Sequence, residues 1–399
     1  MQKDSLFLDK STCNGCNLCA YSCKCSAIEM KQDSEGFMYP FINEKKCIDC
    51  GLCLRVCPQK NVLDTSNITS NGYAFIHTNK EVLQKCTSGG AFIGIVDWFF
   101  QTYTAPVVYG CSLEHDSNKE LYVRHSRVTS FSECIRFTGS KYVQSDLNGI
   151  YDQIHKDLED GRSVLFSGTP CQVVGIYKAF KNWHALGRLV LVDIICHAVP
   201  SPLIFKEHLR SLENVKNKKI ENYTFRFKIK GWGHTEVATF TDQTRIYNSK
   251  VQRLKELFYK DFTTRHSCSK CKYCGPSRVS DFTIGDFWGI ERVQKSLYNA
   301  NGVSFMIVHT VTGQNFVDKY ACRHIIHKVD VLQGYKYNRS KPISLNSKRS
   351  YFWRDYHERG YDYASRKYTD GYIKRLVKTI IRVILPEDLR LKLKKMIIH

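Results

Sequence analysis

The sequence predicts an α+β protein in three parts: a small cysteine-rich domain over residues 1–66, a mixed α/β body over 72–345 and a basic helical tail over 346–399. Three observations predict this class. Two cysteine quartets of identical spacing occupy the first sixty residues. Short β-prone runs alternate with helical periodicity through the middle of the chain, and a basic stretch with apolar positions at helical spacing closes it.

The chain length and the cysteine count limit what kind of protein this is. A chain of 399 residues is long enough for two or three domains, and its eighteen cysteines exceed what packing needs. The charged start, MQKDSLFLDK, lacks the apolar stretch of a signal peptide, so we expect a cytoplasmic protein whose cysteines are metal ligands or free thiols. The longest apolar stretch, residues 91–100, is too short to cross a bilayer.

The net charge of +21 lies entirely outside the cysteine-rich domain. Residues 1–66 hold eight Lys and Arg and eight Asp and Glu, so the excess belongs to the rest of the chain. A basic balance can steer charged partners, but it does not by itself establish nucleic-acid binding. We therefore expect no nucleic-acid partner.

The two cysteine quartets predict two 4Fe–4S clusters. Each run has the spacing Cys-x2-Cys-x2-Cys-x3-Cys, in which three thiolates hold one cluster and the fourth reaches the neighbouring one. The first residues are therefore expected to form a bacterial-ferredoxin-like domain with crossed ligand sets. One cluster is assigned to Cys13, Cys16, Cys19 and Cys57, and the other to Cys47, Cys50, Cys53 and Cys23.

A structural zinc site is the alternative for these cysteines, but zinc sites predict pairs and not complete quartets. One departure concerns the end of the first quartet. The bacterial-ferredoxin pattern places proline after the fourth cysteine, whereas this chain reads Cys23-Lys24-Cys25. Cys25 is either a substitute ligand or a bystander, and the spacing favours Cys23.

The body alternates strand and helix patterns, which predicts a mixed sheet with helices around it. The expected strands are residues 107–110, 163–166, 189–195 and 222–230, and the expected helices are 149–161 and 172–180.

Two glycine-containing segments of the body predict a dinucleotide site. Ser88-Gly89-Gly90 precedes an apolar helix, whose N-terminus is a natural seat for phosphate, although a Gly-Gly pair alone more often marks a turn. Gly139-Ser140-Lys141 adds a second glycine and a cation.

A third cysteine group also lies in the body. Cys268, Cys271 and Cys274 lack a fourth ligand nearby. A metal site there must recruit thiols from elsewhere, and Cys171 and Cys196, each following a predicted strand, are the best candidates.

These segments, together with residues 167–172, 196–202 and the stretch SDFTIGDFWG at 280–289, resemble the beta-subunit family of coenzyme F420 hydrogenases and dehydrogenases. The resemblance runs from Cys13 to about Gly289. It implies a flavin-binding body with bound FAD and a third 4Fe–4S cluster on Cys171, Cys196, Cys268 and Cys271. Cys274 departs from the family pattern, which has only Cys-x2-Cys at this point.

The resemblance also implies which residues contact the flavin. They are Ser88, Gly89, Gly90, Ser140, Lys141, Tyr142 and Gln144, with Gly168 and Thr169 lining the same region.

Several other residues have two interpretations. Cys86, Cys111, Cys134 and Cys322 have no cluster-like neighbours in the sequence and are expected to be buried thiols. His197 is either a proton donor to substrate or a partner of the cluster beside it. Asp286 and Trp288 either face the flavin or close a turn.

The tail holds fourteen Lys and Arg against six Asp and Glu, and residues 373–384 repeat apolar side chains at helical spacing. Packing on the body is the first interpretation. Attachment to the inner face of a membrane is the second, and contact with a partner or nucleic acid is the third.

The function expected from these features is that of a flavin-dependent iron–sulfur oxidoreductase, which passes electrons between the ferredoxin clusters and FAD to reduce or oxidise an acceptor. A redox partner protein or small electron donor is expected, and the acceptor is a deazaflavin or another anionic small molecule. The alternative is a non-catalytic electron-carrier subunit that docks on a separate enzyme.

Overall fold

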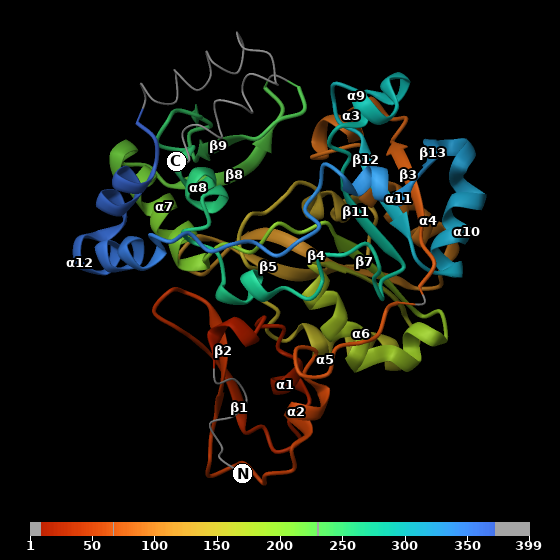
Figure 1. The fold of residues 1–399 in the computed structure, drawn as a ribbon, viewed down its shortest axis with the longest axis horizontal. Helices are drawn as coiled ribbons and strands as arrows, with labels where there is room; N and C mark the ends of the chain where they lie inside the picture. Colours follow the sequence, from red (N-terminus) through yellow and green to blue (C-terminus); the bar gives the residue numbers. More distant parts are fainter. Residues whose placement is uncertain (1–8, 67, 230, 372–399) are drawn as a thin grey trace.

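The computed structural model describes residues 9–66, 68–229 and 231–371. Figure 1 shows a small N-terminal module beneath a body built on one large sheet, with a second, smaller sheet beside it. The fold is thus mixed α/β behind a separate cysteine-rich module.

The N-terminal module is a β-hairpin with short helical turns at its cysteine loops. The hairpin strands pair antiparallel, and the Asp33 carboxylate accepts the backbone N–H groups of Glu35 and Phe37 in the turn between them. The helical turns after the first two cysteines of each quartet begin at the left-handed residues Asn17 and Gly51. The elements are η2 (Lys10–Thr12), α1 (Leu18–Tyr21), β1 (Ile28–Gln32), β2 (Met38–Ile42) and α2 (Leu52–Val56).

The body contains an eight-stranded sheet in the order β13-β3-β12-β11-β7-β6-β4-β5. The pairs β4·β6, β6·β7 and β7·β11 are parallel, and the remaining pairs are antiparallel. The strands are β3 (Asn71–Ile76), β4 (Pro106–His115), β5 (Leu121–Val128), β6 (Ser163–Gly168), β7 (Leu189–Ile194), β11 (Phe282–Asp286), β12 (Ser304–Val308) and β13 (Ile325–Val329).

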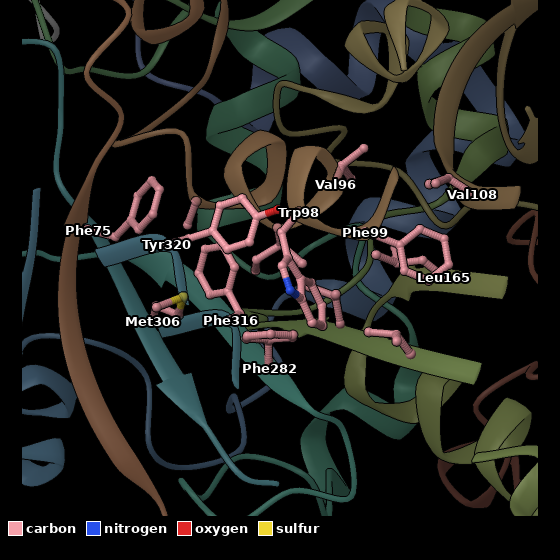
Figure 2. Close-up of a cluster of buried hydrophobic side chains, with 14 of the residues drawn as sticks. Phe75, Val96, Trp98, Phe99, Val108, Leu165, Phe282, Met306, Phe316 and Tyr320 are labelled. Atoms are coloured by element: carbon pink, nitrogen blue, oxygen red, sulfur yellow. The ribbon is translucent and has the colours of Figure 1, made fainter. Parts of the chain in front are cut away.

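Consecutive residues in the central strands of this sheet are apolar. Because successive side chains of a strand point to opposite sides, these residues pack into cores on both faces. In β6, Leu165 packs into the core formed with α4 and α10, whereas Val164 and Phe166 pack toward α5 and α6. Figure 2 shows the first of these cores, in which Trp98 lies among Phe282, Phe316 and other large side chains. The central strands of the sheet are therefore covered on both faces, whereas the edge strand β13 is largely exposed.

Helices cover the sheet on both faces. α4 and α10 lie on one face, with α5 and α6 on half of the other and α3, α9 and α11 on the remainder. These helices and short turns are α3 (Lys80–Lys85), α4 (Ala91–Thr102), η3 (Ser132–Phe137), α5 (Ile150–Glu159), α6 (Pro170–Ala185), α9 (Ile290–Val293), η5 (Lys295–Leu297), α10 (Val311–Tyr320), η6 (Ala321–Arg323) and α11 (Val331–Tyr335).

A second core forms around a three-stranded antiparallel sheet in the order β10-β9-β8. Phe352, Trp353 and Tyr361 of α12 pack into it, so this part of the tail region packs on the body. Its elements are α7 (Pro202–Lys216), β8 (Ile220–Phe227), β9 (Thr235–Phe240), β10 (Arg245–Ile246), α8 (Arg253–Tyr259) and α12 (Arg349–Tyr368), and η4 (His266–Lys270) follows α8. The helix predicted over 373–384 lies outside the described residues.

The predicted elements of the body are confirmed. The expected strands at 107–110, 163–166, 189–195 and 222–230 correspond to β4, β6, β7 and β8, and the expected helices at 149–161 and 172–180 correspond to α5 and α6. Across the described ranges, the structure contains no helix with the length and apolar character needed to traverse a bilayer.

Candidate redox site

A cavity of about 730 Å³ opens at the carboxyl ends of the parallel strands β6, β7 and β11. Ligands of open α/β sheets bind at this edge, because the loops that leave the strands diverge there. Gly168 ends β6 and Thr169 follows it, Cys196 and His197 follow β7, and Asp286 ends β11. All five residues line the cavity. Its volume suits a large organic ligand.

The two glycine-containing segments meet at this cavity. The Ser140 N–H donates to the Thr87 hydroxyl oxygen at 2.9 Å, which joins the loop at 139–145 to the loop before α4. Gly90 has a φ of 83°, precedes α4 directly and has no side chain with which to cap that helix. The Ala91 N–H donates to the Ser304 hydroxyl at 3.4 Å. Gly90, Ala91 and Phe92 line the cavity beside Ser88, so the positive end of α4 borders it, as an anion site requires.

Lys141 contributes a half-buried cation to the same wall. Its ammonium donates to the backbone carbonyls of Arg136 and Thr138 at 2.9 and 2.8 Å. Burial lowers the pKa of Lys141 to about 8, since neither of those acceptors carries a charge to offset desolvation. A bound diphosphate would supply the missing negative charge.

Most of the expected flavin residues line the cavity, but two do not. The cavity wall includes Ser88, Gly90, Ser140, Lys141, Tyr142, Gly168 and Thr169. Gly89 is instead pressed against the backbone of the sheet, where a Cβ would lie 2.2 Å from the Phe75 carbonyl oxygen. Gln144 points to the N-terminal module, because its side chain donates to the Asn14 carbonyl and accepts from Arg265.

The N-terminal cysteines lie in two groups. The first thiol group is Cys13, Cys16, Cys19 and Cys57. Burial raises the pKa of Cys19 well above its usual value, and the other three members raise it further, so the four sulfurs are close neighbours.

The second thiol group is Cys23, Cys47, Cys50 and Cys53. Burial raises the pKa of Cys53, and Cys23 and Cys50 add to the shift. Cys47 lies in the loop before α2, and the Cys25 sulfur lies 3.7 Å from that of Cys23. This group is the more exposed of the two, with Cys50 at the surface.

The third thiol group, Cys171, Cys196, Cys268 and Cys271, also comes together. Burial raises the pKa of Cys196 well above its usual value, and the other three members raise it further. Cys274 lies beside the group, and its hydrogen bond lowers the pKa of Cys271 to about 7. The structure thus brings together four thiols from three separate segments: the start of α6, the loop after β7 and the turn around η4.

The first thiol group neighbours the third, and the third borders the cavity. Cys16 of the first group is an electrostatic neighbour of Cys171 in the third group. Cys196 of the third group lines the cavity itself. Among the described residues, no three His, Cys, Asp or Glu side chains are gathered as one metal ion requires. A four-iron cluster does not need that arrangement, because each iron takes its own thiolate.

The N-terminal module is held against the body by its hairpin turn. Arg349 forms a bidentate pair with the Glu35 carboxylate, and the Ser201 hydroxyl donates to the Glu35 carbonyl at 2.5 Å. Burial alone would raise the pKa of Glu35, but the hydrogen bonds from His266 and Arg349 outweigh it and lower the pKa to about 2. The ionised form of Glu35 is therefore favoured by docking.

We expect Glu35→Gln to lower the free energy of unfolding at pH 7 by roughly 3 kcal/mol, since it breaks a buried ion pair. The docked pKa is depressed, so the stabilisation is complete above the unfolded value of 4.5 and is lost as pH falls toward 2. Urea unfolding should therefore show the gap to wild type narrowing by about 1 kcal/mol between pH 7 and pH 4. Glu29→Gln, on the exposed part of the same hairpin, is the control and should change the free energy of unfolding by less than about 0.5 kcal/mol. A difference between wild type and Glu35→Gln that does not vary with pH would contradict the ion pair of an ionised Glu35 with Arg349.

The three residues with two interpretations all line the cavity. The His197 ring nitrogen Nε2 lies 3.3 Å from the Asp261 carboxylate. Asp286 pairs with Arg226 at 2.5 Å and accepts from the Trp232 indole, and Trp288 stacks on Trp232. Asp286 and Trp288 thus belong to a fixed wall of the cavity.

Four thiols were expected to be buried, and one of these expectations is wrong. Cys86 and Cys134 are buried and Cys111 is half-buried, whereas Cys322 is exposed because it lies in the surface turn η6. Cys86 and Cys111 line the cavity.

Sequence reasoning missed several residues of the cavity wall. Arg226 lies in a predicted strand, and Tyr259 ends a short helix, where its hydroxyl lies 3.1 Å from His234. Arg339 and Lys341 line the cavity from an irregular basic segment. That polar segment, without strand or helix periodicity, was the available signal for a binding loop.

Comparison with known proteins gives one match in the N-terminal module and one in the body. Residues 12–61 match a 4Fe-4S dicluster domain, and residues 161–331 match the family described as the C terminus of the coenzyme F420 hydrogenase/dehydrogenase beta subunit. No curated protein matches the chain. Among solved structures, a chain of the F420-reducing [NiFe] hydrogenase complex from Methanosarcina barkeri, in a xenon-derivatization study, is 14% identical. The match covers 75% of this chain and 90% of that chain, with a TM-score of 0.42. By these two matches, residues 161–331 carry the C-terminal part of the coenzyme F420 hydrogenase/dehydrogenase beta-subunit family, and residues 12–61 form a 4Fe-4S dicluster domain.

Proposed function

We propose that the protein is an iron–sulfur flavoprotein oxidoreductase in which electrons travel between the N-terminal clusters, a third 4Fe–4S cluster and FAD held in the cavity. One observation carries the proposal: the first thiol group neighbours the third, and the third reaches Cys196, in the wall of the cavity where the two glycine-containing loops meet. Neighbouring ligand groups that lead to a cavity are the arrangement that electron transfer to a bound cofactor requires.

The residues of the cavity fit FAD by their chemistry. The N-terminus of α4, which borders the cavity, and the half-buried Lys141 suit the two phosphates of the dinucleotide. Tyr142, Tyr259 and Trp288 supply aromatic surface for a flat ring system. When bound, the flavin would supply the exchange between one-electron and two-electron chemistry, while the protein orients it and excludes water.

The third thiol group fits a cluster for a similar reason. Its four thiols are buried together, where thiolates would repel one another without iron to neutralise them. Cys171, Cys196, Cys268 and Cys271 are the proposed ligands, and Cys274 lies within reach of Cys271 as a substitute or a hydrogen-bond donor.

The proposed acceptor is a deazaflavin or another anionic small molecule. The family description names coenzyme F420, which is a deazaflavin. Among the described residues that line the cavity, Lys141, Arg226, Arg339 and Lys341 are basic and only Asp286 is acidic. Since Arg226 already neutralises Asp286, the remaining cations favour a negatively charged ligand.

Anaerobic purification with iron, sulfide and flavin analysis tests the proposal. We expect about twelve iron atoms per chain, four for each cluster, together with one FAD released on denaturation. About eight iron atoms without flavin would contradict the proposal and indicate an electron-carrier subunit that docks on a separate enzyme. Turnover assays with a panel of anionic acceptors would then identify the substrate of a flavin-containing preparation.

A further inference from the structure

Arg265 lies between the N-terminal module and the body, just before η4 and three residues before Cys268. Its backbone belongs to the body, because the Arg265 N–H donates to the Val199 carbonyl and its own carbonyl accepts the Cys268 N–H. The whole residue is buried, with 0% of its surface exposed. It is therefore held rigidly next to a ligand of the third thiol group.

The guanidinium of Arg265 crosses into the N-terminal module. Its Nε donates to the Cys13 carbonyl at 2.8 Å, and its Nη2 donates to the Met38 carbonyl at 2.9 Å. The third nitrogen, Nη1, donates to the Gln144 side chain at 2.9 Å, and the guanidinium lies 4.2 Å from the centre of the Tyr39 ring. One side chain thus connects a loop of the first thiol group to a loop of the third.

The charge of this guanidinium is not neutralised by a carboxylate. Across the part of the chain that the structure describes, its hydrogen-bond partners are carbonyl and amide oxygens and the Cys13 sulfur, which lies 3.7 Å away. Arg278, on another side of the third thiol group, is different, because it lies 3.6 Å from the buried Asp193 carboxylate. A buried cation without a counter-ion is costly unless negative charge lies beside it.

The thiol groups supply that negative charge. Arg265 favours the thiolate forms of Cys13 in the first group and of Cys171 and Cys268 in the third, although burial dominates all three pKa values and raises them. The same cation therefore acts on two groups at once. A cluster bound by four thiolates carries net negative charge and becomes one unit more negative when it accepts an electron.

We propose that Arg265 is a positioning residue that raises the reduction potentials of the first and third clusters together by holding one uncompensated positive charge between them. The inference rests on the proposed function for the third cluster but not for the first. A fixed cation stabilises the reduced, more negative state of each cluster more than the oxidised state. The pair thereby stays reducible by electrons that enter through the exposed second cluster.

The test is a potentiometric dithionite titration of the full chain, followed by low-temperature electron paramagnetic resonance. We expect Arg265→Gln to lower the midpoint potentials of the first and third clusters. At the wild-type midpoint potential, the ratio of reduced to oxidised cluster should fall roughly tenfold, as expected for losing a unit charge in a poorly screened site. The second cluster should change little, because its thiols are not among the described hydrogen-bond partners of this arginine.

Two further variants separate charge from structure. Arg265→Lys keeps the charge and should stay closer to wild type than Arg265→Gln. Gln144→Glu places a carboxylate against the guanidinium without removing it, and should lower the same two potentials even where Arg265→Gln fails to fold. Lys272→Gln is the control, since Lys272 is an exposed cation that contacts the same module through the Gln59 carbonyl.

Unchanged potentials in both Arg265→Gln and Gln144→Glu would overturn the proposal, and so would an equal fall in Arg265→Lys and Arg265→Gln. An equal fall in the Lys272→Gln control would also overturn it, because the effect would then not belong to the buried charge. Failure of the proposed function has a different signature. A protein with about eight iron atoms would lack the third cluster, while the potential of the first cluster would still test Arg265.

Discussion

Replacing Cys196 by Ala is expected to slow electron transfer between the N-terminal clusters and the cavity by at least about 100-fold. The substitution removes a direct ligand of the proposed third cluster, and loss of a residue that only hydrogen-bonds to a metal ligand already costs about 10- to 100-fold in activity. Cys196 is the member of the third thiol group that lines the cavity. No other thiol of the three groups does so, and the proposed route would therefore be cut next to the cavity.

Stopped-flow reduction of the flavin by pre-reduced N-terminal clusters measures this effect. In Cys196→Ala the signal of the third cluster should be lost, while those of the first and second clusters remain. Bound flavin should also remain, because Cys196 is not one of the residues expected to hold it. Direct photoreduction of that flavin should then still succeed, which would show that the break lies before it.

Cys134→Ala is the matched control for this experiment. Cys134 is also buried, but it lies in η3 with its thiol on the Ser130 carbonyl, away from the three thiol groups. It should keep the wild-type rate and lose only packing, on the order of 1 kcal/mol. A wild-type rate of flavin reduction in Cys196→Ala would contradict the proposed route.

A single methyl group at Gly89 is expected to destabilise the protein by about 3 kcal/mol and to release the flavin. A Cβ at this position would lie 2.2 Å from the Phe75 carbonyl oxygen and 2.4 Å from the Ser304 nitrogen. Both atoms belong to the backbone of the main sheet, which cannot yield as a flexible side chain would, so overpacking costs of this size are expected. The Gly89 carbonyl also accepts the His77 N–H, so its displacement would move Ser88 and the start of α4.

Thermal unfolding and flavin retention after gel filtration measure the effect of Gly89→Ala. We expect the unfolding midpoint to fall by about 5 °C or more, with loss of flavin under conditions where wild type keeps it. Gly233→Ala is the control, because a Cβ there would meet only the Gly231 carbonyl at 3.9 Å, and it should stay within about 0.5 kcal/mol. An unfolding midpoint unchanged by Gly89→Ala would show that the loop tolerates displacement and would refute a tight fit at this position.

Local patterns predicted a large part of the molecule. The cysteine spacing predicted a two-cluster module, which the 4Fe-4S dicluster match confirms, because cluster ligation there depends on neighbours a few residues apart. Short β-prone apolar runs predicted β4, β6 and β7, since these strands are covered on both faces and must be apolar on both. The helix after Ser88-Gly89-Gly90 was predicted for the same local reason.

Contacts between distant segments escaped these patterns. Gln144 lies in a segment expected to touch the flavin, yet its side chain points to Asn14 and Arg265, because the docked module offers it partners that the local sequence does not reveal. Arg226 and Tyr259 reach the cavity from the second sheet and its helix. Their place there depends on how the two sheets pack.

The sequence by itself determined the identity of the cluster-binding module, three of the eight strands of the main sheet and the candidate cluster ligands, because spacing and periodicity are properties of neighbouring residues. Only the tertiary structure decided that the first and third thiol groups are neighbours and that the third reaches a cavity at Cys196. It also decided that Arg265 lies buried between the first and third groups. Those arrangements join residues far apart in the sequence, because the N-terminal module packs against the body through Glu35, Arg349 and Arg265.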